Sequence, residues 1–171
     1  MSKPATQFVG EPAELTILKM VGGFALSQSL YVRGKPAVPE LVAGGPKGVE
    51  ELASPTETDA DALYRVLRLL ASAGVFAETD GRVFALTPLG EKLKTGPGTM
   101  RSMTLHLAEG PSWGAWGALM HSVRTGETAF AHANGAEVFP FYAAHPESAE
   151  PFNEAMSEMS AAVGRAVVES Y

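Results

Sequence analysis

The first long apolar stretch of the chain runs from Leu15 to Val32 and has no polar side. Its apolar residues fall on every face of a helix, so the pattern predicts a helix beginning at Ala13 that is covered all round. In a chain of 171 residues, the chain itself can cover one side of such a helix, and the simplest cover for the other side is another copy of the chain. The alternative is a central helix in a monomeric bundle. Lys19 and two adjacent glycines inside the stretch argue against a membrane span.

Prolines and glycines divide residues 33–48 into short pieces around Val38 to Val42, and Pro36 is expected to break the first helix. A short helix is predicted at residues 48–53. An amphipathic helix over residues 59–73 follows, because apolar residues recur there at i, i+3, i+4 and i+7. These residues are Leu63, Val66, Leu67 and Leu70.

The ends of that amphipathic helix carry their own signals. Thr58 and Asp61 form a capping-box pattern before it, and Gly74 is placed to end it. Two short strands are predicted next, at residues 75–78 and 83–86, because Asp80-Gly81 between them is a hairpin signal.

Thr87-Pro88 then has the pattern of an N-cap and first residue of another helix, with two lysines near its end. Helix, turn, helix and hairpin in this order are typical of a winged helix. We therefore expect a mainly α fold with three parts. Residues 1–12 form a flexible tail, residues 13–99 form a winged-helix-like domain with a small β-hairpin wing, and residues 100–171 add C-terminal helices.

Aromatic residues and methionines mark the faces of the C-terminal helices. One face carries Met100, Met103 and Leu107; a second helix, capped by Ser112, carries Trp113, Trp116, Met120 and Val123. A loop is expected from residue 126 to about residue 136, then a short aromatic segment at residues 139–144. Pro146 opens a last helix, whose stripe is Phe152, Met156, Met159, Val163 and Val167. These side chains are interpreted either as ordinary core or as the wall of a flat apolar ligand pocket.

Charge and composition limit the kinds of molecule that the chain can bind. Lysine and arginine number 13 against 19 aspartates and glutamates, and the resulting net charge of −6 repels phosphate backbones. The exposed face of the 59–73 helix and the hairpin is also poorly suited to DNA. It holds three basic residues, Arg65, Arg68 and Arg82, against four acidic ones, Asp59, Asp61, Glu78 and Asp80. The start of the chain lacks a secretory-signal pattern, so we expect a cytoplasmic protein with no nucleic acid and no membrane partner.

Motifs for catalysis are absent from the sequence. It holds no Walker loop, no G-x-G-x-x-G after a strand and no G-x-S-x-G elbow, and the absence of cysteine excludes thiolate chemistry. The four histidines lack metal-ligand spacing, and His121 is interpreted as a hydrogen-bonded core or surface residue. We therefore expect no catalytic, cofactor-binding or metal-ligating residue in this chain.

Several segments in series resemble one enzyme family. Leu63–Phe76 (LYRVLRLLASAGVF) and Phe84–Gly90 (FALTPLG) closely resemble the N-terminal domain of S-adenosylmethionine-dependent O-methyltransferases of the plant caffeate and bacterial polyketide-tailoring type. Trp113–Gly126 (WGAWGALMHSVRTG), Ala129-Phe130, His145–Glu147 (HPE) and Phe152–Met156 (FNEAM) look like the same family in the same order. The likeness covers about residues 13–171.

The resemblance implies a winged-helix dimerisation domain whose first helices interlock with those of a second copy, giving a homodimer. It also implies that this domain lends apolar residues to the pocket of an aromatic or polyketide-like acceptor. The residues carried over as substrate-binding are Phe152, Asn153 and Met156, and the assignment extends to Trp113, Trp116 and Met159. They would position the acceptor rather than move its proton.

The sequence departs from the family at its end. The family's glycine-rich cofactor loop, its acidic ribose ligand and its histidine base all follow the position of Tyr171, so no Rossmann domain is expected in this chain. Residues 100–171 are interpreted as a helical substrate-lid and linker region leading to a missing methyltransferase domain. We expect the chain alone to be inactive and to bind no S-adenosylmethionine. Two alternatives remain: a standalone winged-helix regulator that senses an aromatic ligand, and a repurposed small-molecule binding protein.

Overall fold

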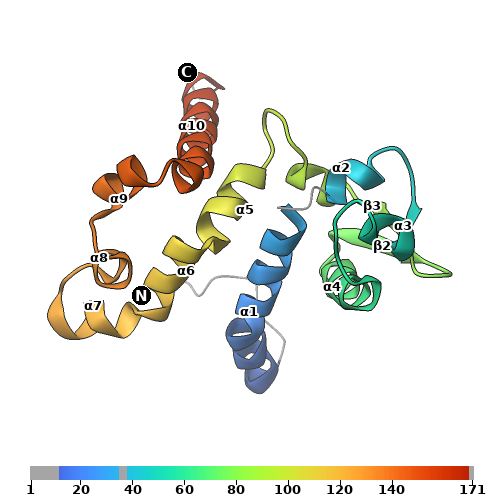
Figure 1. The fold of residues 1–171 in the computed structure, drawn as a ribbon, viewed down its shortest axis with the longest axis horizontal. Coiled ribbons are helices and arrows are strands. Elements are labelled where there is room, and N and C mark those ends of the chain that lie inside the picture. Colours follow the sequence, from blue (N-terminus) through green and yellow to red (C-terminus); the bar gives the residue numbers. More distant parts are fainter. Residues whose placement is uncertain (1–11, 35–37, 170–171) are drawn as a thin grey trace.

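The computed structural model of the chain describes residues 12–34 and 38–169, which form a mainly helical structure with one small sheet (Figure 1). This confirms the prediction of a mainly α fold. The tail predicted for residues 1–12 lies outside these ranges apart from Pro12, and Pro36 lies outside them too.

Helix α1 (Ala13–Gly34) is the long helix predicted from the apolar stretch. Its C-terminal half is packed: Leu26 and Leu30 lie against the core, and Ser29 is buried. The Gln28 side-chain amide donates a hydrogen bond of 3.0 Å to the carbonyl oxygen of Ala108. Its N-terminal half is exposed and extends past α4 and α6 at the lower edge of Figure 1. The described residues therefore cover only one half of this apolar helix.

The hydrophobic core lies between short helices and the sheet. Helices α2 (Val38–Val42), α3 (Val49–Ala53) and α4 (Ala60–Ser72) surround it. The predicted stripe on α4 is confirmed, with three leucines buried and Val66 half-buried. The largest fully buried side chains are Phe76, Phe84, Leu52, Leu67, Leu70, Val38, Val49 and Pro39. Gly74, with φ of 78°, ends α4 as predicted.

The predicted capping box at the start of α4 is wrong by one residue. The N-cap is Asp59, whose carboxylate accepts a 2.8 Å hydrogen bond from the backbone N–H of Ala62. The Thr58 hydroxyl instead pairs with that of Thr56 at 2.8 Å. Asp61 turns outward to Arg82, so its carboxylate takes no part in the cap.

Strands β2 (Phe76–Thr79) and β3 (Val83–Leu86) form the predicted antiparallel hairpin, although β2 begins one residue later than expected. The turn between them uses Gly81 and Arg82, both at positive φ. A third strand, β1 (Lys47–Gly48), pairs with the outer edge of β3 and gives the order β1-β3-β2. The sequence predicts a turn and a helix start at residues 47–48 instead, because a strand of two residues has no alternation pattern.

The helix predicted from Thr87-Pro88 is wrong. Only a short 3₁₀-helix forms, η2 (Gly90–Leu93). The Thr87 hydroxyl does accept a hydrogen bond of 3.1 Å from the Gly90 N–H, as an N-cap would. The same hydroxyl donates to the carbonyl of Gly74 at 2.7 Å, which ties this turn to the end of α4. The chain then turns at Gly96 and Gly98, both at positive φ, so the helix has no room to continue.

Six helices follow: α5 (Arg101–Ala108), α6 (Gly110–Gly117), α7 (Leu119–Thr125), α8 (Ala129–Asn134), α9 (Val138–Ala144) and α10 (Pro146–Glu169). The last helix begins at Pro146 as predicted. The single helix predicted from Ser112 is wrong, because it begins after Glu109 and breaks at Ala118. The loop predicted from residue 126 to about residue 136 contains α8. The aromatic segment predicted at residues 139–144 forms helix α9. Val163 and Val167 lie outside the side chains described. No helix of the described residues is long and apolar enough to cross a bilayer.

Candidate functional site

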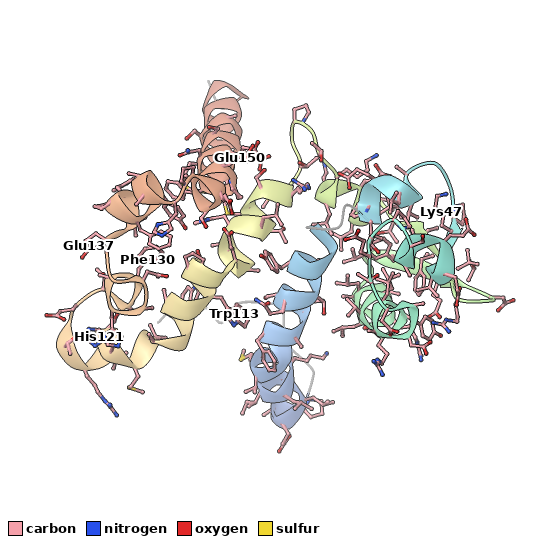
Figure 2. All side chains as sticks on the ribbon, viewed as in Figure 1. Lys47, Trp113, His121, Phe130, Glu137 and Glu150 are labelled. Carbon is pink, nitrogen blue, oxygen red and sulfur yellow. The ribbon has the colours of Figure 1, made fainter. Side chains whose placement is uncertain are left out.

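An aromatic cluster joins the C-terminal helices. Phe152 of α10 stacks on Tyr142 of α9, with ring centroids 4.5 Å apart and planes 9° from parallel. His106 of α5 meets the edge of Phe152 at 5.1 Å. Phe130 of α8, labelled in Figure 2, meets Phe141 edge to face at 5.5 Å. Phe152, the first predicted substrate residue, therefore packs into a shared aromatic core that four helices build.

Polar groups lie inside this cluster. The Tyr142 hydroxyl is 3.3 Å from Nδ1 of His106, which accepts a hydrogen bond when the imidazole is neutral and protonated on Nε2. Burial lowers the pKa of His106 and raises the pKa of Tyr142. Both shifts favour the neutral forms. The Ser148 hydroxyl donates to the Glu109 carboxylate at 3.4 Å nearby. Sequence reasoning missed His106 and Tyr142, because residues 36 positions apart share no spacing signal.

The lowered pKa of His106 predicts a weak acid sensitivity. Because the unfolded chain takes up this proton at a higher pH than the folded chain, stability is lost as the pH falls through about 6.5. The ring is partly exposed, so we expect the loss to stay below about 1 kcal/mol. Urea unfolding at pH 7.5 and pH 5.5 measures it. The variant His106→Gln should show a shallower pH dependence, and an equal slope in both proteins would contradict the prediction.

The tryptophans lie on the side of α6 that faces α1. Trp113 and Trp116 line a groove of about 430 Å³ between α1, α5 and α6. We call it the tryptophan groove; its other lining residues are Ser27, Leu30, Thr104, Leu107 and Ala108. Figure 2 labels Trp113 here, between α6 and α1, and Phe130 on the side of α8. The two tryptophans share one groove, as their spacing predicted, but Phe152 lies elsewhere.

The remaining predicted residues follow α10. Asn153 is exposed in a polar groove of about 530 Å³ beside Ser102, whose hydroxyl donates to Glu154 at 2.7 Å. Met159 lies in an apolar groove of about 500 Å³ with Met103 of α5 and with Met100, the residue just before α5. Met156 is half-buried. Five of the six predicted substrate residues are therefore distributed over the aromatic cluster and three grooves, and Met156 lines none of these three grooves. The described residues do not gather the six in one pocket.

Two histidines stack at the far end of the molecule. The rings of His121 and His132 are parallel, with centroids 3.9 Å apart, and Nε2 of His121 is 3.3 Å from the Glu127 carboxylate. This confirms the interpretation of His121 as a hydrogen-bonded residue. Parallel stacking prevents the two rings from sharing one metal ion. In the part of the chain described, no three histidine, cysteine or acidic side chains are grouped as metal ligands.

On the surface of α4 and the hairpin, two of the three arginines, Arg68 and Arg82, lie beside carboxylates. Arg82 lies 2.9 Å from Asp61 and 3.6 Å from Glu50, and its guanidinium covers the ring of Tyr64. Arg68 lies 3.5 Å from the Glu78 carboxylate. Since Arg68 and Arg82 already face carboxylates, these two side chains are less available for contacts with phosphate groups.

Comparison with known proteins decides the family. Residues 18–96 match the O-methyltransferase dimerisation domain. Residues 18–96 are an O-methyltransferase dimerisation domain. This dimerisation domain contains most of α1, the core helices and the sheet. The resemblance found in the sequence is confirmed.

Two comparisons, one of sequence and one of structure, extend the match beyond the dimerisation domain. The phenazine O-methyltransferase PhzM of Lysobacter antibioticus is 42% identical over 161 residues, 94% of this chain and 47% of that protein. The crystal structure of LaPhzM superposes with a TM-score of 0.89 at 42% identity, covering 94% of this chain and 48% of that one.

Another relative was crystallised with a bound ligand. The methyltransferase of calicheamicin biosynthesis, in its SAH-bound form, has a TM-score of 0.76 and 30% identity over 88% of this chain and 45% of that one. The chain thus spans about half the length of these relatives.

Proposed function

We propose that this chain is the dimerisation and acceptor-pocket part of an S-adenosylmethionine-dependent O-methyltransferase that acts on a small aromatic or polyketide-like molecule in the cytoplasm. The main support is the 42% identity to a phenazine O-methyltransferase over 94% of the chain. The order α3, α4 and hairpin, with β1 on the outer edge, supports a winged-helix arrangement for residues 13–99. Residues 100–171 act as substrate lid and linker.

Helix α1 is the proposed dimer contact. Its exposed apolar residues form what we call the α1 face: Leu15, Ile17, Leu18, Met20, Val21 and Phe24. A contiguous apolar surface of this kind marks an interaction site in a soluble protein. A second copy is the natural partner for a dimerisation domain, and a symmetric dimer buries the same surface on both copies.

The acceptor wall is proposed on α10 and its neighbours. Phe152, with His106 and Tyr142 behind it, offers flat aromatic surface, and Met156 and Met159 offer adaptable apolar surface along the same helix. Asn153 adds an exposed amide that can donate or accept a hydrogen bond. These groups orient the acceptor so that its oxygen points at the methyl group to be transferred. Bound S-adenosylmethionine would supply that methyl group, and the part played by this chain's residues would be to align the acceptor oxygen with it.

The dimer is tested by light scattering of the 171-residue chain over a dilution series from about 50 µM to about 50 nM, in the range of ordinary dimer affinities. A mass of twice the monomer that persists to low micromolar concentration is expected. Leu18→Glu, on the exposed half of α1, should convert the protein to a folded monomer. A wild-type chain that is a well-folded monomer throughout would overturn the proposal.

Cofactor binding is expected to fail for these 171 residues alone. Their described strands form an antiparallel sheet, whereas the glycine-rich turn that holds an adenosyl group follows a strand of a parallel sheet. Calorimetric titration with S-adenosylmethionine should therefore show no binding heat. A dissociation constant in the micromolar range would contradict this expectation.

A further inference from the structure

The hydroxyl of Tyr142 fixes the position of the proton on the His106 imidazole. Tyr142 is buried, and its hydroxyl lies 3.3 Å from Nδ1 of His106. Burial raises the pKa of this hydroxyl, and the Ser112 hydroxyl acts in the opposite direction, because it can donate a hydrogen bond to the Tyr142 oxygen. With a donor already on that oxygen, the O–H of Tyr142 is directed at Nδ1. A neutral imidazole that accepts a hydrogen bond at Nδ1 carries its hydrogen on Nε2.

Nε2 of His106 is therefore a hydrogen-bond donor, and it is open to a ligand. The described residues provide no hydrogen-bond partner for it. His106 is half-buried, yet Nε2 is not one of the buried side-chain atoms that lack a partner in the described part of the chain, so this atom reaches the surface. Burial of the ring lowers the pKa of His106, which keeps the imidazole neutral at pH 7.

This donor lies beside the flat surface of the proposed acceptor wall. The His106 ring meets the edge of Phe152 at 5.1 Å, with the two planes 64° apart. Phe152 also stacks on Tyr142, so the tyrosine that fixes the donor supports the wall as well. On another side Phe152 meets Phe139 at 6.3 Å, and Phe139 is 76% exposed. A flat molecule that lies on this wall brings its rim close to Nε2 of His106.

We propose that His106 donates a hydrogen bond from Nε2 to the molecule to be methylated, and that Tyr142 is the positioning residue that holds the imidazole for this contact. The inference rests on the proposed function and narrows its substrate class to flat aromatic molecules with a carbonyl oxygen or a ring nitrogen on the rim. A site built to donate a hydrogen bond discriminates against an analogue without a lone pair, because the covered donor is then left unpaired.

The same geometry limits what His106 can do chemically. A neutral imidazole with its hydrogen on Nε2 and its Nδ1 lone pair engaged by Tyr142 has no free lone pair. His106 therefore orients the bound molecule and does not take up its proton.

The first test compares quinoline with naphthalene, two flat compounds that differ by one ring nitrogen. Binding to the 171-residue chain is followed by NMR titration at pH 7.5, where quinoline is uncharged. His106→Phe should raise the dissociation constant of quinoline about 5-fold, the contribution of one neutral hydrogen bond, and change that of naphthalene less than about 2-fold. His121→Phe is the matched control, because it replaces another partly buried histidine, which stacks on His132 outside the aromatic cluster. It should leave both constants unchanged.

Two further variants keep this comparison interpretable, and circular dichroism checks that each protein is folded. If His106→Phe does not fold because the Tyr142 hydroxyl has lost its acceptor, the double variant with Tyr142→Phe replaces it. His106→Gln should restore part of the quinoline affinity, because the glutamine amide nitrogen can donate from about the position of Nε2.

The positioning role of Tyr142 is measured by ¹⁵N NMR of the imidazole, which distinguishes the two tautomers. In the wild type, His106 should be a single tautomer with its hydrogen on Nε2. In Tyr142→Phe, the ring should exchange between both tautomers and quinoline should bind more weakly. A wild-type His106 with its hydrogen on Nδ1 would contradict the proposal.

The failure of this inference is distinguishable from the failure of the proposed function. If His106→Phe weakens quinoline binding no more than naphthalene binding, the donor role is overturned and the acceptor wall stands. If neither compound shifts the NMR signals of Phe152 and Tyr142 in the wild type, the acceptor wall itself is overturned, and the donor role with it.

Discussion

Replacement of Gly90 by alanine is expected to lower the free energy of unfolding by about 3 kcal/mol or more. A Cβ atom at this position would lie 2.3 Å from the carbonyl oxygen of Val75 and 2.8 Å from a methyl carbon of Leu86. The Leu86 side chain can rotate away, but the carbonyl cannot move freely. It accepts a hydrogen bond of 3.5 Å from the backbone N–H of Thr87 and lies at the junction of α4 and β2. The clash is therefore relieved only by moving backbone.

Gly117→Ala is the matched control for this substitution. Gly117 ends α6, and a Cβ atom there would meet nothing within 4 Å. Since alanine favours helix over glycine, we expect the control to be neutral or stabilising by up to about 1 kcal/mol. Chemical denaturation followed by circular dichroism measures both variants. Equal stability of Gly90→Ala and wild type would show that η2 can separate from the end of α4 at little cost.

Phe84→Ala is the second substitution with a large expected effect, a loss of about 3–5 kcal/mol. Phe84 is fully buried in the middle strand of the sheet. Its backbone pairs with Lys47 on one side and Glu78 on the other, and its ring meets Tyr64 edge to face at 6.0 Å. Truncation therefore removes a buried aromatic ring from the core and with it one of the contacts between α4 and the sheet. A domain of this size has a total stability of about 5–15 kcal/mol, so the variant would be partly unfolded near 37 °C.

The control is Phe139→Ala, which removes the same ring from an exposed position on α9. Its effect should lie within about 0.5 kcal/mol, as is usual for surface substitutions. Thermal unfolding followed by circular dichroism compares the two. A Phe84→Ala protein as stable as Phe139→Ala would mean that the sheet contributes little to the core and that the helices hold it together.

The candidate site was only partly predictable from the sequence. Helical spacing correctly grouped Trp113 with Trp116, because positions three apart share a face of one helix. The same reasoning could not separate these residues from Phe152, which lies in the aromatic cluster with His106. Contacts of that kind depend on how α5, α9 and α10 pack against one another. The spacing of residues within one helix does not predict this packing.

Helix caps and very short strands were also only partly predictable from the sequence, although they involve residues that are close together in the chain. Asp59, rather than Thr58, caps α4, and a two-residue strand completes the sheet at Lys47. In both cases several nearby residues could have taken the role, and the packing of the chain decides which of them does. The helix expected after Pro88 is only a short 3₁₀-helix, which the Thr87 hydroxyl ties to the end of α4 and which the turns at Gly96 and Gly98 follow closely.

The sequence by itself determined the features that arise within one element. The all-round apolar α1, the leucine stripe of α4, the hairpin turn at Gly81 and the stop at Gly74 follow from helical period and backbone sterics. The tertiary structure alone decided which half of α1 is covered, where the tryptophans face, and that His106 meets Tyr142. These are contacts between residues far apart in the chain, whose free energy comes from burial and shape complementarity, and neither is encoded in the spacing of neighbouring residues.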